Sequence, residues 1–224
     1  MAISAKNLTV RYGRTTIIDD MTFGPLEEGK VVGLIGPNAA GKSTLVKTIA
    51  GIKKPSQGTC SIVVDGCEVT GKSRTTAIGY VPQDMLTTAS LTAFESIMVS
   101  AKRRGAVDAD PVAATADIME RLNITHLADR MVSDMSGGQR QLVGVAQMLV
   151  RTPSVLLLDE PTSALDLRHQ VHLLEIIRDE VAGTDRLALV AIHDLNLAAR
   201  FCDELLVVKA GRVVALDTLS LIHI

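Results

Sequence analysis

The chain has 224 residues, of which 47% are hydrophobic, and a formal net charge of −2 at pH 7. A chain of this length and hydrophobic content can bury a large core, so the composition excludes a disordered protein. The near-balanced charge also argues against a nucleic-acid partner, because proteins that bind phosphate backbones normally carry a basic excess.

The sequence shows no signal for crossing a membrane. Residues 1–13 lack a continuous apolar core of signal-peptide length, and no segment approaches the roughly 18 apolar residues of a spanning helix. We therefore expect the chain to stay in the cytoplasm unless a partner holds it at a membrane. Cys60, Cys67 and Cys202 are in no zinc-binding spacing and are expected to be reduced and without a chemical role.

The first part of the chain has the patterns of β-strands, with one helix after the third of them. Strands are predicted over residues 3–12, 15–23, 31–35 and 77–84, and a hairpin over 60–69 that turns at Asp65 and Gly66. The helix is predicted over residues 42–51, where Gly51 and then Pro55 end it.

From about Leu86 to Leu149 the pattern changes to helices, which indicates a helical insertion. Strands and helices alternate again after Ser154, and the central strands are continuously apolar. The predicted helices are 93–104, 110–123, 142–150, 167–182 and 195–202, and the later strands are 155–160, 186–192 and a hairpin over 204–216. This alternation predicts an α/β fold with a mainly parallel sheet covered by helices on both faces.

Residues 36–44 read GPNAAGKST, which matches the pattern G, four residues, then G-K and Ser or Thr. The motif follows a predicted buried strand and opens a predicted helix, where backbone N–H groups and the helix dipole favour a phosphate. Lys42 can then reach the β and γ phosphates of a nucleotide, and the Ser43 hydroxyl can bind Mg²⁺. A tight turn with a solvated lysine is the alternative. The predicted phosphate-binding residues are Gly36, Pro37, Asn38, Ala39, Ala40, Gly41, Lys42, Ser43 and Thr44.

Two acids follow the apolar strand of residues 155–158, in the stretch VLLLDEP. A carboxylate at the C-terminal end of a parallel strand beside a phosphate loop is placed to hold Mg²⁺, which suits Asp159. Glu160 can polarise an attacking water, so its loss should stop turnover without stopping binding. The alternative, two acids that cap the next turn, does not explain why they occur together with a phosphate loop.

With the stretch MSGGQ at residues 135–139, the sequence resembles the ATP-binding cassette (ABC) ATPases over about residues 3–217. MSGGQ matches the motif that separates this family from other phosphate-loop proteins, although Met135 stands where leucine is usual. The resemblance implies an α/β fold of the ABC type, with a mainly parallel core sheet, an N-terminal antiparallel β subdomain and a helical insertion. We expect one ATPase domain over residues 1–217, with a helical subdomain at about 86–150.

The resemblance also implies roles for single residues. Tyr12 is expected to stack on adenine, and Gln83 to bind Mg²⁺ and to connect the helical insertion with the core. His193 is expected to contact the γ-phosphate, and Asp166, in SALD, to lie at a subunit interface. The expected catalytic residues are Glu160, His193, Lys42 and Gln83, the metal ligands are Ser43, Gln83 and Asp159, and the cofactors are ATP and Mg²⁺.

In this family two cassettes pair head to tail, which gives the second glycine-opened helix start a function. Ser136, Gly137 and Gly138 would face the γ-phosphate of the ATP held by the Lys42 loop of the other subunit, and Gln139 belongs to the same motif. A helix N-terminus favours an anion, and small residues let the backbone approach it. The implied partner is a second cassette, expected to be identical.

A single cassette with no membrane span resembles the separate ATPase subunits of importers. The stretches LDLRHQ and HDLNLAARFCD resemble the ATPases of iron–siderophore, haem and cobalamin uptake, and we expect an iron chelate as cargo. Membrane permease subunits would be direct partners at the cytoplasmic side of the membrane, through a surface at residues 83–100, and a substrate-binding protein an indirect one. Another cargo, such as a metal ion or an amino acid, and a soluble assembly ATPase are the alternatives.

Three features depart from this picture or need a second interpretation. Ala39 replaces the glycine usual at its place, which matters if the position needs a positive φ, although we expect nucleotide binding to survive. His169 and His172 are three apart on a predicted helix and could bind a metal, but an ordinary helix surface is the simpler interpretation. Residues 218–224 are expected to be a truncated or unrelated tail.

Overall fold

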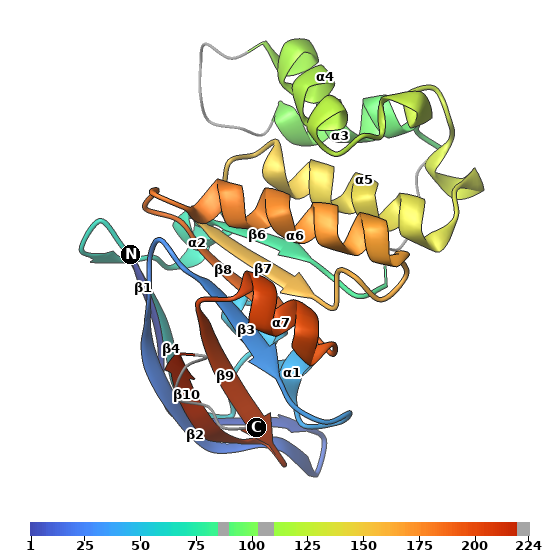
Figure 1. Cartoon of the computed structure of the whole chain (residues 1–224). Helices are drawn as coiled ribbons and strands as arrows, with labels where there is room; N and C mark the ends of the chain where they lie inside the picture. The colour runs from blue at the N-terminus through green and yellow to red at the C-terminus, as the bar shows by residue number, and fades with distance from the viewer. Residues whose placement is uncertain (85–89, 103–109, 219–224) are drawn as a thin grey trace.

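The computed structural model describes residues 1–84, 90–102 and 110–218. Two β-sheets form the lower part of the molecule together with α1 and α7, and α3, α4, α5 and α6 lie above them (Figure 1). Among the described residues, no helix combines the length and the apolar character needed to cross a membrane.

The N-terminal sheet is antiparallel and has the strand order β2-β1-β4-β5. Its strands are β1 (Ala2–Tyr12), β2 (Thr15–Glu27), β4 (Gln57–Val64) and β5 (Cys67–Glu68). The turn between β4 and β5 lies at Asp65 and Gly66, both with positive φ, as the hairpin prediction required.

The core sheet has the order β10-β9-β3-β8-β7-β6, in which all neighbouring pairs are parallel except β9 and β10. Its strands are β3 (Val31–Ile35), β6 (Ile78–Val81), β7 (Val155–Asp159), β8 (Leu187–Ala191), β9 (Glu204–Lys209) and β10 (Arg212–Thr218). The central strands β3, β7 and β8 are buried along their whole length, which explains their continuous apolar sequences.

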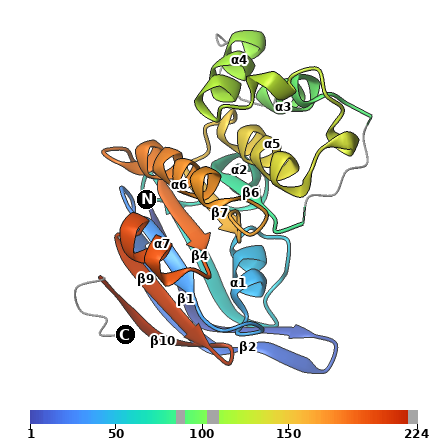
Figure 2. The same ribbon diagram turned by 45° about the vertical axis from the view of Figure 1, so that its right-hand side comes forward.

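Helices lie on both faces of the core sheet. They are α1 (Lys42–Ile49), α2 (Gly71–Ala77), α3 (Ala93–Ala101), α4 (Pro111–Arg121), α5 (Gly137–Leu149), α6 (Leu167–Val181) and α7 (Leu195–Phe201), with 3-10 turns at Thr125–Leu127 and Val132–Asp134. One hydrophobic cluster joins α1 and the antiparallel sheet to one face of the core sheet, and a second joins α3 to α7 to the other face. Figure 2 shows α1 on the side of β4, and α3 and α4 stacked above α5 and α6.

The predicted fold class is confirmed, and the differences are local. Helix α2 was not predicted, because GKSRTTA has no apolar period and buries no residue. A capping box between Thr70 and Ser73 starts this helix. Helix α4 ends at Arg121, before the predicted residue 123, because Asn123 takes a left-handed conformation with φ 55°. The predicted helix end at 103–104 lies outside the described residues. Of the tail predicted over 218–224, Thr218 is the last residue of β10, and residues 219–224 lie outside the described residues.

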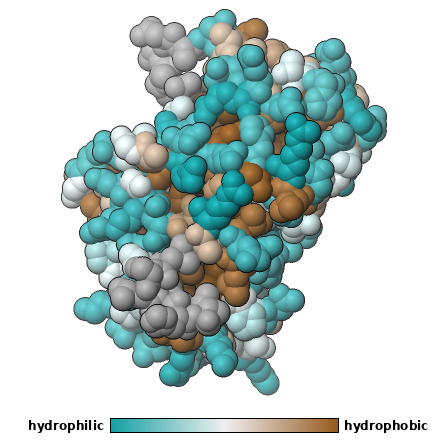
Figure 3. Space-filling view, viewed as in Figure 1, coloured by the Kyte–Doolittle hydropathy of each residue, from teal (hydrophilic) through white to brown (hydrophobic). Residues whose placement is uncertain are grey.

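The surface above the sheets is mainly hydrophilic. Hydrophobic residues are exposed between the hydrophilic ones in the middle of this view (Figure 3).

Candidate functional site

The loop between β3 and α1 is wound around the ammonium group of its own lysine. Lys42 is 5% exposed, and its Nζ donates to the carbonyl oxygens of Gly36, at 2.8 Å, and Pro37, at 3.3 Å. Gly41 is the N-cap that precedes α1, and its φ of 102° favours glycine. The backbone N–H groups of the first helical turn have no partner within the helix, so this end of α1 suits a phosphate, as predicted.

The backbone at Gly36 and at Ala39 limits which residues can occupy these two positions of the loop. A Cβ atom on Gly36 would lie 2.1 Å from the carbonyl oxygen of Val208 on β9, so the close approach of two strands requires glycine. Ala39 has φ 62°, which is the left-handed conformation that the sequence analysis considered for this position. A residue with a Cβ pays roughly 1 kcal/mol for it.

A hydroxyl and a carboxylate meet beside this loop. Asp159 at the end of β7 is 1% exposed, and its Oδ1 accepts a 2.8 Å hydrogen bond from Ser43 Oγ. Burial raises the pKa of Asp159 and nearby Glu160 adds to the effect, while the bond from Ser43 opposes it. A buried carboxylate with a raised pKa gains from a cation nearby, and Mg²⁺ prefers carboxylate and hydroxyl oxygens. These two residues therefore fit a magnesium ion.

Glu160 is the meeting point of three loops. It has a positive φ of 55°, which turns its side chain out of the end of β7. One carboxylate oxygen accepts from Gln83 Nε2 at 2.9 Å, and the other lies 2.5 Å from His193 Nε2. Gln83 follows β6 and His193 follows β8, so the parallel strands on either side of β7 deliver both partners.

These groups line one cavity of about 480 Å³. Its lining residues are Ile17, Asn38, Ala39, Ala40, Gly41, Lys42, Ser43, Thr44, Gln83, Glu160 and His193. The structure thus brings together most of the predicted phosphate, metal and catalytic residues in one place. Ile17 was not predicted, because nothing in the β2 sequence shows that its backbone passes the loop; its carbonyl oxygen lies 3.3 Å from the Cβ position of Gly41.

Tyr12 is outside this lining but close to it along the sheet. It ends β1, where the hairpin to β2 brings back Thr15 and then Ile17. The residue is 45% exposed, and the Lys53 ammonium lies 4.0 Å from the ring centroid. Lys53 was not predicted to contact Tyr12, because a lysine near a helix end has no distinguishing pattern.

The second glycine motif lies in a separate place. Ser136 caps α5, and its Oγ accepts from the N–H of Gln139 at 3.3 Å while Gln139 Oε1 accepts from the N–H of Ser136 at 3.1 Å. With Gly138, Ala164 and Asp166 they line a different cavity of about 270 Å³. Within one chain this motif and the phosphate loop therefore do not share a cavity.

The two histidines of α6 have ordinary structural partners. His169 Nδ1 lies 2.8 Å from Asp166 Oδ1, and His172 Nε2 lies 3.0 Å from the carbonyl oxygen of Arg121. Among the described residues, no group of three or more His, Cys, Asp or Glu side chains is placed to hold a metal ion. The surface interpretation of these histidines thus fits their contacts.

Comparison with known proteins agrees with this geometry. A family model described as ABC transporter matches residues 18–163. A cobalamin import ATP-binding protein of Halobacterium salinarum is 40% identical over 219 residues, which are 95% of this chain and 54% of the relative, so the chain spans about half the length of that protein. A hemin import ATP-binding protein of Bradyrhizobium diazoefficiens is 35% identical over 95% of this chain and 81% of the relative. A ferric enterobactin transport ATP-binding protein of Escherichia coli is 32% identical over 95% and 80%.

Solved structures show the same fold. The dimeric post-hydrolysis state of an ATP-binding cassette with bound ADP and Pi superposes with a TM-score of 0.85 at 25% identity, over 97% of this chain and 98% of the other.

Proposed function

This chain belongs to the ABC transporter family, and we propose that it binds and hydrolyses ATP to drive an importer of an iron chelate of the siderophore, haem or cobalamin type. The observation that carries the proposal is the single cavity in which Lys42, Ser43, Gln83, Glu160 and His193 converge.

The residues of this cavity would have separate roles in phosphate binding, metal binding and hydrolysis. Lys42 leaves the Gly36 and Pro37 carbonyls to pair with the β and γ phosphates, while the N–H groups at the start of α1 hold the phosphate oxygens. Ser43 and Asp159, with Gln83, would hold Mg²⁺, which when bound neutralises charge that develops on the phosphates. Positioning and electrostatic stabilisation of this kind supply most of the catalysis in phosphoryl transfer.

Glu160 orients the attacking water and takes up its proton. In the nucleotide-free chain both of its carboxylate oxygens are engaged, one by Gln83 and one by His193. With nucleotide bound, Gln83 would help to hold the metal ion and His193 would contact the γ-phosphate, which would leave the Glu160 oxygens free to accept from a water. General-base assistance of this kind contributes roughly 10²- to 10⁴-fold in rate.

One chain would not complete the phosphate site. Ser136 and Gly138 line a cavity away from the phosphate loop, and a second copy, paired head to tail, would bring them and Gly137 against the γ-phosphate. ATP would then join the two copies, and its hydrolysis would release them.

The relatives named as import or transport ATP-binding proteins support a partner in the membrane. We propose that membrane permease subunits hold the chain at the cytoplasmic face of the membrane and that a substrate-binding protein delivers the cargo. The expected permease surface runs from Gln83 to Ser100, of which residues 85–89 are not described. Glu95 in this region accepts from the N–H of Thr92 and so also caps α3.

The test is light scattering on the Glu160→Gln variant after size exclusion. With ATP and Mg²⁺ we expect a shift from monomer to dimer, because binding persists while turnover stops. With ADP, or with Lys42→Ala added, the variant should remain a monomer. A variant that binds ATP tightly and stays a monomer would contradict the shared site.

A pull-down separates the transport function from the assembly function. Gentle solubilisation of native membranes should recover an integral membrane permease with the chain. If all of the protein is instead recovered in a soluble complex that contains no membrane protein, the result would support the alternative function as a soluble assembly ATPase.

A further inference from the structure

The ring of Tyr12 is not free on both faces. Lys53, half-buried in the loop between α1 and β4, places its ammonium 4.0 Å from the ring centroid. At this distance a cation is attracted to the electron-rich face of an aromatic ring. One face of the ring is therefore covered, and 45% of the residue is exposed to solvent for another contact.

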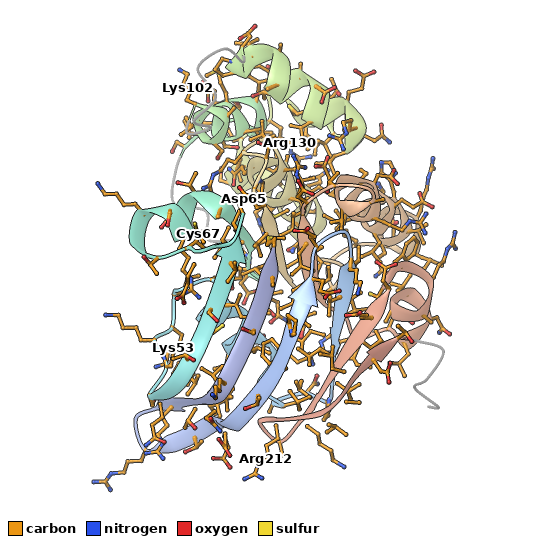
Figure 4. The ribbon with its side chains drawn as sticks, turned by 90° about the vertical axis from the view of Figure 1, so that its left-hand side faces the viewer. Lys53, Asp65, Cys67, Lys102, Arg130 and Arg212 are labelled. Carbon is orange, nitrogen blue, oxygen red and sulfur yellow. The ribbon has the colours of Figure 1, made fainter. Side chains whose placement is uncertain are left out.

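The backbone fixes Lys53 in this position from two sides. The N–H groups of Ile52 and Lys53 donate to the carbonyl oxygen of Lys47 in the last turn of α1, at 2.9 and 3.1 Å. Further along the loop, the N–H of Ser56 donates to the carbonyl oxygen of Thr9 on β1, at 2.7 Å. Figure 4 shows Lys53 beside the four-stranded sheet, between Lys102 near the top of the view and Arg212 at the bottom.

Helix α1 thereby connects two parts of one binding site. Its N-terminus carries the phosphate loop, and its C-terminus holds the lysine that contacts Tyr12. Eight helical residues span about 12 Å, so the contact between Lys53 and Tyr12 lies about one helix length from the phosphate loop.

We propose that Lys53 is a positioning residue for the nucleotide base: it holds the Tyr12 ring by a cation–π contact and leaves the opposite face of the ring for adenine. This inference rests on the proposed role of Tyr12 as the base platform. A ring that is already oriented loses less conformational entropy when the base stacks on it, so the contact strengthens binding of the base and not of the phosphates.

The test compares Lys53→Met with Lys54→Met, a matched change at the exposed neighbouring lysine, by titration calorimetry in the Glu160→Gln background. Lys53→Met should weaken ATP binding roughly two- to fivefold, which corresponds to the usual strength of such a contact. Lys54→Met should leave it unchanged, and Lys53→Arg, which keeps the cation, should restore most of it. Inorganic tripolyphosphate, which has no base, should bind all four proteins equally.

The outcomes separate this inference from the proposed function. An equal loss for ATP and tripolyphosphate would overturn it, because Lys53 would then act on the phosphates. Tighter ATP binding by Lys53→Met would also overturn it, because the lysine would then compete with the base. In a Tyr12→Ala background, Lys53→Met should have no further effect. If Tyr12→Ala itself leaves ATP affinity unchanged, the platform role of Tyr12 fails, while ATP-dependent dimers of Glu160→Gln would still support the ATPase.

Discussion

Asp159 occupies an environment that disfavours its own charge. It is 1% exposed, Glu160 adds a second carboxylate nearby, and burial raises its pKa. Ser43 gives it one hydrogen bond, at 2.8 Å. A group whose native pKa is raised above its ordinary value of 3.8 destabilises the folded protein wherever it is ionised. The nucleotide-free protein thus bears a cost that a bound cation would relieve.

Replacement of Asp159 by Asn should therefore stabilise the metal-free protein and abolish its activity. We expect a gain of roughly 0.5–2 kcal/mol at neutral pH and a loss of ATPase activity of about 10²-fold or more. As the pH falls through the raised pKa, the wild-type carboxyl takes up a proton and its cost disappears, so the gain should shrink as the solution becomes more acidic. Urea unfolding in EDTA across pH measures this, and a gain that grows in acid would contradict it.

The roles of single residues were predictable where a motif fixes them. The pattern GPNAAGKST identified the phosphate loop, and the resemblance added Gln83 and His193, which the structure brings to Glu160. Lys53 and Ile17 were not found, because each reaches its place only through the packing of one segment on another. The roles themselves stay predictions until nucleotide binding is measured.

At the scale of elements, the two glycines at the start of α5 differ in how closely the Ala164 loop approaches them. A Cβ on Gly138 would lie 2.6 Å from the carbonyl oxygen of Ala164, in the loop that follows β7. A Cβ on Gly137 would meet only the Cβ of Ala164, at an ordinary 3.7 Å. Both residues have helical neighbours and neither has a positive φ, so only the close approach distinguishes them.

Gly138→Ala should therefore push α5 away from the Ala164 loop, whereas Gly137→Ala should be tolerated by the folded monomer. We expect Gly138→Ala to lower stability by about 1–3 kcal/mol, and Gly137→Ala to change it by less than about 0.5 kcal/mol. Thermal unfolding of both variants measures the difference. Equal effects of the two variants would show that the contact with Ala164 does not hold this helix.

Elements with strong periodicity were predicted well, and those without it were not. The buried strands β3, β7 and β8 and the amphipathic helix α6 lie where the sequence indicated. Helix α2 was not predicted because it buries no residue. It is stabilised by its N-terminal capping box and by Arg74, which donates to the carbonyl oxygens at the end of α1. The order of the strands in each sheet could not be derived from periodicity either, because it depends on contacts between segments that are far apart in the sequence.

At the scale of the whole molecule, one half-buried acid adds ion pairs to the apolar contacts that join the upper helical layer to the core. Glu180 on α6 has a side chain 9% exposed and pairs with Arg121 at the end of α4 and with Arg186 before β8. His172 adds a bond to the carbonyl oxygen of Arg121, at 3.0 Å. The helical insertion over about 86–150 was predicted from its sequence pattern. The ion pair between Arg121 and Glu180 was not predicted, because these residues are about 60 positions apart in the sequence.

Glu180→Gln should loosen α4 from the core, because two guanidinium groups would then face each other without a carboxylate. We expect a loss of roughly 1.5–3 kcal/mol in the free energy of unfolding and faster hydrogen exchange in α4. The control is Glu175→Gln on the same helix, whose pair with Arg200 is exposed and 3.9 Å long, so its loss should cost between about 0 and 1 kcal/mol. If exchange in α4 stays slow while stability falls, the acid stabilises α6 and β8 alone, and the helical layer must be held by its apolar contacts with α5.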